Sequence, residues 1–504
     1  MGKRLYLETF GCQMNVLDSE LVMGQLCAQG YEPVGDRDQA EVILYNTCSV
    51  REHAEQKVWS RLGELRERKA REPGLVIAVI GCMAEREGLD LARRYPHVDI
   101  LCGPGELDKL AGMVHNAIVT RLEERRPMAA LLGNSTRRSG TLAAAESEDR
   151  LELLDLSRAV SDSESTRSAH VRITRGCNKF CTYCVVPNTR GPEVHRKPGN
   201  IIDEVRKLAD AGVIEITLLG QTINHYLYDH GDGRKTTFAD LLYQVHESAP
   251  SVSRLRFVTS FPRDFSDAAL DAMRDCPRIC RYLHVPAQHG SDRILRMMNR
   301  GYTAGQYRQF IERARQRMPD VSIASDFIVG FPSETDEDFQ ATMQLVRDCR
   351  FKNSFIFKYS PRPGTAAIER FADDVPEETK RRRNNLLLAE QQRVSEEGNR
   401  QMVGRTVEVM VEGKSKLVSR QLAAAGNNGD SSGGLVELGW KNRLVTRASE
   451  ARTQLVGRTR GDQVVVYDGP ESWTGRIMNV LVVDARNLTL FGEAAVAAVA
   501  DQIS

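Results

Sequence analysis

Three closely spaced cysteines after a strand-like run constrain this chain most. Cys177, Cys181 and Cys184 have the spacing Cys-x3-Cys-x2-Cys, and the residues just before them, 170–174, have the pattern of a β-strand. Three thiolates can bind three corners of a cubane iron–sulfur cluster and leave the fourth iron without a protein ligand. Such an iron can chelate a small molecule, whereas a cluster used only for electron transfer would be closed by a fourth thiolate. The triplet therefore predicts a cluster that takes part in chemistry.

A structural zinc site is the alternative interpretation of this triplet. Structural zinc sites usually have four cysteine or histidine ligands, and no further Cys or His lies within a few residues of Cys184. The cluster is therefore the preferred interpretation.

The first 118 residues alternate between strand and helix patterns. Alternation of this kind predicts a doubly wound parallel sheet with right-handed crossovers. The expected strands are 5–10, 42–46, 75–80 and 98–101, and the expected helices are 18–29, 51–70 and 86–94.

A second group of cysteines follows the strands of this N-terminal sheet. Cys12, Cys48 and Cys82 each stand just after a successive strand. A parallel sheet brings the ends of its strands to one edge, where open α/β sheets bind ligands. We expect the three thiols to converge there. Position alone leaves open whether they are cluster ligands or small residues in tight turns.

The segments around both triplets resemble the radical S-adenosylmethionine methylthiotransferases. The resemblance rests on 11–15, 46–52, 81–84 and Cys-Val-Val-Pro-Asn-Thr-Arg-Gly at 184–191, and Asn-Thr-Cys-Ser-Val-Arg-Glu at 46–52 is similar to the MiaB-type tRNA enzymes. The resemblance implies two 4Fe-4S clusters. Cys12, Cys48 and Cys82 would hold an auxiliary one, and Cys177, Cys181 and Cys184 would hold the one that coordinates S-adenosylmethionine.

Residues 168–397 again alternate between strands and helices and predict a partial (β/α)6 barrel like a TIM barrel with two units missing. Strands are expected at 170–174, 215–219, 254–259, 281–285, 322–329 and 354–359. Barrel chemistry occurs at the carboxyl ends of the strands. By resemblance, the cofactor contacts expected there are Gln221, Ser260, Gln288 and Asp326. Thr222, Phe261 and His289 depart from the family pattern.

The remaining segments are assigned by composition. Residues 119–167 are rich in Ser, Ala, Glu and Arg and are expected to be a linker, and Lys380 to Arg383 is expected to be a solvated helix face. Residues 399–494 predict a small all-β barrel that resembles the RNA-binding TRAM module. A loop insert is expected near 421–434 and a tail at 495–504. The expected strands are 406–412, 435–438, 463–467, 475–485 and 487–491.

Composition excludes few partners. The formal net charge is +1, so a nucleic acid would have to be bound through local patches. The chain has no secretory signal pattern and no apolar stretch of the length that spans a membrane, so a cytoplasmic protein is expected. Eleven cysteines in a reducing compartment indicate ligands and packing residues. The packing residues are expected to be Cys27, Cys102, Cys276, Cys280 and Cys349.

The resemblance implies a transferase that methylthiolates carbon 2 of N6-isopentenyladenosine at position 37 of tRNA, next to the anticodon. The implied partners are tRNA bearing that nucleoside and an electron donor such as flavodoxin or ferredoxin, and the chain is expected to be a monomer. Two alternatives stay open. One is methylthiolation of another tRNA adenosine or of a ribosomal protein side chain, and the other is a non-enzymatic iron–sulfur RNA-binding protein. No residue is assigned a catalytic role beyond holding cofactors.

Overall fold

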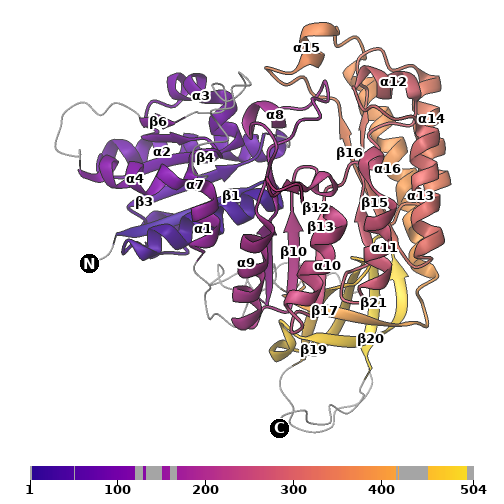
Figure 1. The fold of residues 1–504 in the computed structure, drawn as a ribbon. Coiled ribbons are helices and arrows are strands. Elements are labelled where there is room, and N and C mark those ends of the chain that lie inside the picture. Colours follow the sequence, from indigo (N-terminus) through magenta and orange to yellow (C-terminus); the bar gives the residue numbers. More distant parts are fainter. Residues whose placement is uncertain are drawn as a thin grey trace, which may run out of the picture.

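The computed structural model describes residues 3–49, 52–119, 129–131, 150–158, 167–415, 418 and 452–495. Figure 1 shows three parts, an indigo sheet with its helices, a magenta to orange half-barrel beside it, and a yellow barrel below. No helix in the described part of the chain is long and apolar enough to cross a membrane.

The N-terminal part is a six-stranded sheet with the order β2-β1-β3-β4-β5-β6. All five neighbouring pairs are parallel, as the alternation of strands and helices predicts. The strands are β1 Arg4–Phe10, β2 Glu32–Pro33, β3 Val42–Thr47, β4 Val76–Gly81, β5 Ile100–Cys102 and β6 Ala129–Leu131. The helices are α1 Gln13–Ala28, η1 Arg37–Gln39, α2 Glu52–Arg71, α3 Cys82–Arg94, η2 Leu107–Lys109 and α4 Leu110–Val119.

Alternate residues of β3 and β4 supply two separate cores. Val42 and Leu44 pack in one core with helices α1 and α4, whereas Ile43 and Tyr45 pack in the other with α2 and α3. Successive side chains of a strand point to opposite faces, so a strand covered on both faces is apolar throughout. The doubly wound prediction is confirmed.

The segment expected to be a linker contributes two elements, which corrects that expectation. β6 continues the sheet by pairing with β5, and α7, Arg150–Leu156, packs Leu151 and Leu154 into the core beneath α1. A three-residue strand and a two-turn helix carry too few apolar residues to show periodicity in a polar stretch.

The central part is a half-barrel whose strands form two parallel sheets, β13-β10-β7 and β14-β15-β16. An isolated parallel bridge between Leu255 and Ile279 links them. The strands are β7 Ser168–Arg172, β10 Glu215–Leu219, β13 Arg254–Val258, β14 Tyr282–His284, β15 Ser322–Val329 and β16 Asn353–Lys358. Two small antiparallel pairs accompany them, β8 Thr174–Arg175 with β9 Val194–His195, and β11 Leu227–Asp229 with β12 Lys235–Thr237.

Helices line the outer face of the half-barrel (Figure 1). The helices of this part, including the short ones in its connections, are α8 Val186–Thr189, α9 Pro198–Asp210, η4 Ile223–His225, α10 Phe238–Ser248, η5 Pro262–Asp264, α11 Asp267–Asp275, α12 Asp292–Met297, α13 Ala304–Arg317, α14 Asp336–Cys349, α15 Ala366–Arg370 and α16 Glu377–Arg400. The expectation of a solvated face at 380–383 is wrong for two of the four residues. Lys380 and Arg383 are buried, since acidic residues of neighbouring loops pair with them.

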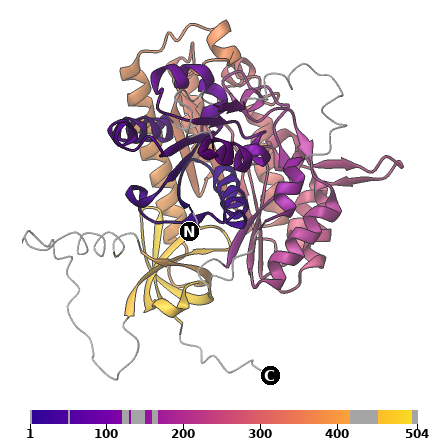
Figure 2. The same ribbon diagram turned by 90° about the vertical axis from the view of Figure 1, so that its left-hand side faces the viewer.

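The C-terminal part is a closed five-stranded barrel with the order β17-β18-β19-β21-β20. Figure 2 shows it below the other two parts. The strands are β17 Thr406–Lys414, β18 Arg452–Thr459, β19 Val464–Pro470, β20 Ile477–Arg486 and β21 Thr489–Ala494, with η6 Glu471–Trp473 between β19 and β20. The small all-β barrel is confirmed, although β18 was not expected as a strand. The expected strand 435–438, the insert 421–434 and the tail after residue 495 lie outside the described residues.

Candidate metal centres

The register of the N-terminal sheet brings the first cysteine triplet together. Phe10 of β1 pairs with Thr47 of β3, which pairs with Gly81 of β4, so the three strands end at one level. The cysteines follow directly. Cys12 caps the N-terminus of α1, Cys48 follows β3, and Cys82 opens α3.

Two glycines allow the close approach of these strand ends. A Cβ on Gly11 would lie 2.6 Å from the Cβ of Cys48, and Gly81 adopts φ 89°, which favours glycine. Buried Asn15 holds the turn, because its Nδ2 donates to Asn46 Oδ1 over 2.8 Å while its Oδ1 accepts from Cys12 Sγ over 3.0 Å. The strand ends are therefore rigidly held.

The thiols of this triplet differ in acidity. A hydrogen bond with Cys48 and the positive charge of Arg190 outweigh burial and lower the pKa of Cys12 to about 6. Burial raises the pKa of the Cys82 thiol, although Arg190 opposes the shift. Thiolates are the ligand form of cysteine, so the arrangement already favours a ligand state at Cys12.

The second triplet lies in the loop after β8. Gly176 adopts φ 66° because Gly191 and Pro192 pass directly against it, and the backbone N–H of Cys177 donates to Gly191 O over 3.2 Å. Cys181 is buried and its backbone carbonyl accepts from the N–H of Cys184 over 3.0 Å. A tight, closed loop therefore presents the three thiols.

Burial lowers the acidity of two thiols of the second triplet, Cys177 and Cys184. Burial first, and then the charge of Cys181, raise the pKa of Cys184 to about 12. Burial likewise raises the pKa of Cys177, and it outweighs the opposite effect of a contact of 3.5 Å with Thr222 Oγ1. Without a bound cation these thiols stay protonated, and a bound metal deprotonates coordinating thiols.

Arg300 supports the second triplet, and sequence reasoning missed it. Its Nη1 donates to Cys181 Sγ over 3.4 Å, and its other donors are used by Tyr302 Oη and Pro286 O, both at 2.9 Å. The guanidinium stacks 4.4 Å above the Phe261 ring. The unusual Phe261 thus forms part of the platform under Cys181, which no local pattern around residue 300 reveals.

Arg190 links the two triplets. It follows the second triplet in sequence, yet its guanidinium is buried against Asp18 on α1, 2.9 Å from Oδ2. Cys12 and Cys82 lie close enough to raise the pKa of Arg190 further. One segment of the half-barrel therefore reaches the edge of the N-terminal sheet.

A buried ion network holds these parts together around Asp18. Arg172 of β7 contacts Asp18 over 2.8 Å and Asp155 of α7 over 2.5 Å. Arg175 reaches the other oxygen of Asp155 over 2.6 Å. Burial alone would raise the pKa of Asp155, but the adjacent arginines hold it well below its usual range. Asp155, in the segment that was expected to be a linker, thus helps to join the N-terminal part to the half-barrel.

Three of the four expected cofactor contacts follow strands of the half-barrel, whereas Asp326 lies within β15, and their surroundings differ. Ser260 is buried, and its hydroxyl has no hydrogen-bond partner among the described residues. Gln288 has φ 68°, with its backbone bonded to β15 on both sides. Asp326 is engaged by His284 Nε2 over 2.9 Å, and Gln221 follows β10, partly buried. Of the four residues, Ser260 is therefore the one with a buried polar side-chain atom that has no hydrogen-bond partner among the described residues.

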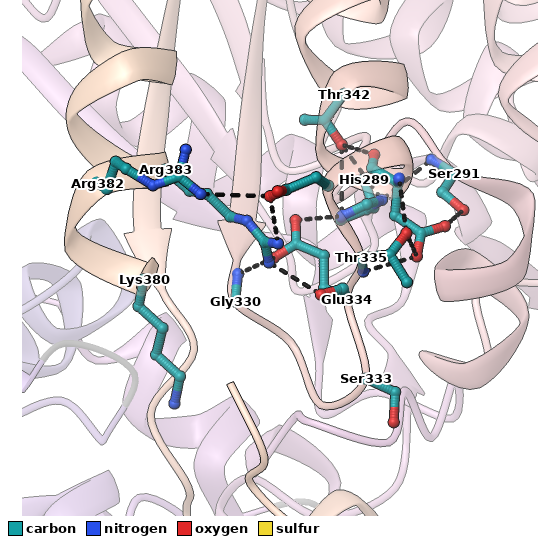
Figure 3. A network of polar contacts seen from close by, with 12 residues as sticks. His289, Ser291, Gly330, Ser333, Glu334, Thr335, Thr342, Lys380, Arg382 and Arg383 are labelled. Carbon is teal, nitrogen blue, oxygen red and sulfur yellow. Dashed lines mark hydrogen bonds and ion pairs between the residues drawn. The ribbon is translucent and has the colours of Figure 1, made fainter. Parts of the chain in front are cut away.

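His289 belongs to a buried network, as expected of a structural histidine. Its Nε2 donates to Glu334 Oε1 over 3.0 Å, and its Nδ1 accepts from the N–H of Ser291 over 3.0 Å. Glu334 also accepts from Arg383 of α16 over 2.9 Å and from the N–H of Gly330. Figure 3 shows these side chains converging between α16 and the loop after β15. The unusual His289 therefore ties strand-end loops to a long helix.

The five other cysteines do not join either triplet. Cys102, Cys276, Cys280 and Cys349 are buried, in agreement with packing roles. Cys27 is exposed, so a packing role for it is wrong, because it lies at the solvent side of the last turn of α1.

Comparison with known proteins places the chain in a class. Residues 171–346 match the radical SAM superfamily, and residues 4–103 match the uncharacterized protein family UPF0004. A solved radical S-adenosylmethionine methyltransferase, TsrM from Kitasatospora setae, is similar in fold, with a TM-score of 0.50 at 17% identity over 73% of this chain and 77% of that one. The class is that of radical S-adenosylmethionine enzymes.

Curated relatives narrow the class to one family. A tRNA-2-methylthio-N(6)-dimethylallyladenosine synthase from Rhodopirellula baltica is 44% identical over 98% of this chain and 95% of its own. A protein of the same name from an Acidovorax species is 40% identical over 98% of both chains. This chain belongs to the family of tRNA-2-methylthio-N(6)-dimethylallyladenosine synthases.

Proposed function

We propose that this chain methylthiolates carbon 2 of N6-isopentenyladenosine in tRNA, beside the anticodon. Its relatives carry the name of that activity. The observation that carries the proposal is that the segment after the second triplet reaches the first one, because Arg190, which follows Cys184 in sequence, contacts Asp18 and lies near Cys12 and Cys82. Carbon 2 of adenine has an unactivated C–H bond, so acid–base chemistry cannot prepare it for sulfur, and two different centres are needed.

The donor sets fit two cubane clusters. Each triplet offers three thiols and leaves one iron open, as a cluster that binds a small molecule requires. When bound, these clusters supply the electron that cleaves S-adenosylmethionine and the sulfur that is transferred. Cys177, Cys181 and Cys184 would hold the cluster that supplies the electron. Cys12, Cys48 and Cys82 would hold the cluster that supplies the sulfur.

We propose that S-adenosylmethionine lies across the strand ends beside the second triplet. The unsatisfied hydroxyl of Ser260 is the clearest sign, since buried polar groups normally have partners. Gln221, Gln288 and Asp326 surround the same strand ends and would contact the ribose and amino acid parts. Asp326 would share its carboxylate with His284.

Each of the three parts of the chain would have its own role. We propose the domains 1–118, 168–397 and 399–494, with α7 of the connecting segment packed on the first. The C-terminal barrel would hold tRNA through phosphate contacts, which position the RNA without reading the base. We further propose a cytoplasmic monomer with no membrane partner that receives electrons from a flavodoxin or ferredoxin.

Reconstitution with defined tRNA tests the substrate. Anaerobically reconstituted protein should convert prenylated tRNA, detected by nucleoside mass spectrometry, and should turn over tRNA from a prenyltransferase-deficient strain about a hundredfold more slowly. Burying the five isopentenyl carbons contributes roughly 3 to 4 kcal/mol. Prior prenylation of the same tRNA is the control. Equal turnover of both tRNAs would contradict the proposal.

Two triple variants test the clusters separately. Replacing Cys177, Cys181 and Cys184 by Ala should remove about half the iron and all formation of 5'-deoxyadenosine. Replacing Cys12, Cys48 and Cys82 should remove the product but leave 5'-deoxyadenosine. The matched control is C276A/C280A, a Cys-x3-Cys pair outside both triplets, which should keep its iron. Product from the N-terminal variant would overturn the role of the first triplet.

A further inference from the structure

A third group of metal-ligating side chains lies beside the second triplet. Glu193, His195 and His225 each present one ligand atom, and these atoms all lie within 4.8 Å of one another, a grouping found nowhere else among the described residues. Glu193 precedes β9, His195 is the last residue of β9, and His225 ends η4. Neither cysteine triplet contributes to the group.

Two atoms of this group are buried without partners. Glu193 is 2% exposed at its side chain, and its Oε2 pairs with His225 Nδ1 over 2.7 Å. Its Oε1 and the Nδ1 of His195 have no hydrogen-bond partner in the described part of the chain. Buried polar atoms are normally satisfied, so two such atoms in one cluster indicate a missing ligand.

The chemistry of the donors indicates which ligand is missing. Two imidazoles and one carboxylate are a known ligand set for zinc, with a fourth position left open. Neutral imidazole is the form of histidine that binds metal, and the Nδ1 of His195 has no hydrogen-bond partner among the described residues. We propose that Glu193, His195 and His225 bind one zinc ion, separate from both iron–sulfur centres.

The ion would join two segments that flank Cys177. The N–H of Glu193 donates to Asn178 Oδ1 over 3.1 Å, on the cysteine loop. The residue before η4, Thr222, contacts Cys177 Sγ with its hydroxyl at 3.5 Å. Zinc at this place therefore clamps β9 to η4 across the first cysteine of the second triplet and stabilises that loop. The site does not depend on which substrate the enzyme modifies.

Zinc binding to the cluster-loaded protein tests the proposal. After zinc titration and desalting, elemental analysis should find about one zinc per chain in addition to the cluster iron. Zinc-edge X-ray absorption should show nitrogen and oxygen ligands at about 2.0 to 2.1 Å and no sulfur at about 2.3 Å. Absence of bound zinc, or sulfur ligation that persists in H225A, would overturn the proposal.

Ligand variants make the test specific. H225A, at a partly exposed residue, and E193Q should each lower the zinc affinity by about 100-fold or more. The control H230A removes an exposed histidine that contacts only Thr236 in the described hydrogen bonds, and it should bind zinc normally. Zinc should also raise the Tm of the wild type and of H230A but not of H225A, since a ligand of the folded state stabilises it. Unchanged affinity in H225A would contradict the assignment.

Discussion

Arg190 shows how one residue can decide the geometry between two centres. Its guanidinium is buried beside Asp18, with Cys12 and Cys82 as further neighbours. A buried charge that loses its partner is strongly destabilising, so this contact fixes the position of the segment after Cys184. Together with the ion pairs of Arg172, this contact holds the segment after the second triplet against the N-terminal part.

Arg190→Met should uncouple the two centres. Losing a buried ion pair costs about 3 to 5 kcal/mol, which is enough to lower the yield of methylthiolated nucleoside by at least about tenfold. Formation of 5'-deoxyadenosine should persist, because Arg300 and not Arg190 contacts the second triplet. The control is Arg206→Met on α9, whose side chain is exposed. Equal loss of both products would show that Arg190 also supports the second triplet.

His284, at the end of β14, pairs with Asp326 of β15 over 2.9 Å. Burial tends to lower the pKa of His284, but Asp326 outweighs burial and raises the pKa above its ordinary value of about 6.5. A group whose pKa is higher in the folded state than in the unfolded state contributes stability. That contribution is fully present at pH values below the unfolded-state pKa, and it is lost as the pH rises through the folded-state pKa. Asp326→Asn should therefore lower Tm most near pH 6 and progressively less above pH 7. A Tm difference that grows with pH would contradict this pairing.

At the scale of elements, α16 is held by charges that face inward. Arg383 reaches Glu334 and Asp336 at the start of α14, while Lys380 pairs with Asp373. Glu334 also accepts from Gly330 and His289, so one carboxylate joins α16 to two strand-end loops (Figure 3). The long helix thereby braces the loops expected to contact the cofactor.

Glu334→Ala tests this brace. The change leaves Arg383 with Asp336 and the backbone carbonyl of residue 334, and it leaves His289 Nε2 without its carboxylate, at a cost of about 3 to 5 kcal/mol. We expect a clear fall in Tm and weaker binding of S-adenosylmethionine by calorimetry. Glu390→Ala, on the same helix, removes a carboxylate that pairs with two half-exposed arginines, Arg347 and Arg393, and should change neither by a comparable amount. Equal effects of the two changes would argue against the brace.

At the scale of the whole molecule, the C-terminal barrel is docked through arginines of β13. Arg254 is fully buried, donating to Glu408 Oε1 over 2.8 Å and to Arg458 O over 2.8 Å. Arg256 adds a bond to Thr459 O over 2.7 Å. These bonds hold β17 and β18 against the half-barrel at the end where β13 begins.

Arg254→Ala should loosen this docking. Carbonyl and carboxylate groups left unpaired cost about 3 kcal/mol or more. The affinity for tRNA measured by filter binding should fall, while cleavage of S-adenosylmethionine should be retained. Arg281→Ala, which removes an exposed pair with Asp320, is the control and should leave tRNA binding unchanged. Unchanged tRNA affinity in Arg254→Ala would mean that the barrel position does not matter for binding.

Much of this protein follows from its sequence alone. The strand and helix periodicity predicted the parallel sheet and the half-barrel, because apolar spacing reports directly which faces are buried. Strands 215–219 and 322–329 were predicted to the residue. The strand-end positions of Cys12, Cys48 and Cys82 likewise predicted that they meet at one edge of the sheet, because the ends of parallel strands lie together.

Only the tertiary structure decided the contacts between elements. Arg190 meets Asp18, Arg300 meets Cys181, and the carboxylate of Glu193 meets His225, each across a separation in sequence that no periodicity records. The helix α7 was hidden in a polar segment for the same reason, because its Asp155 is buried only by arginines of another element. The sequence determines the elements through short-range hydrophobic patterning, whereas a buried charge acquires its partner only when the chain has packed.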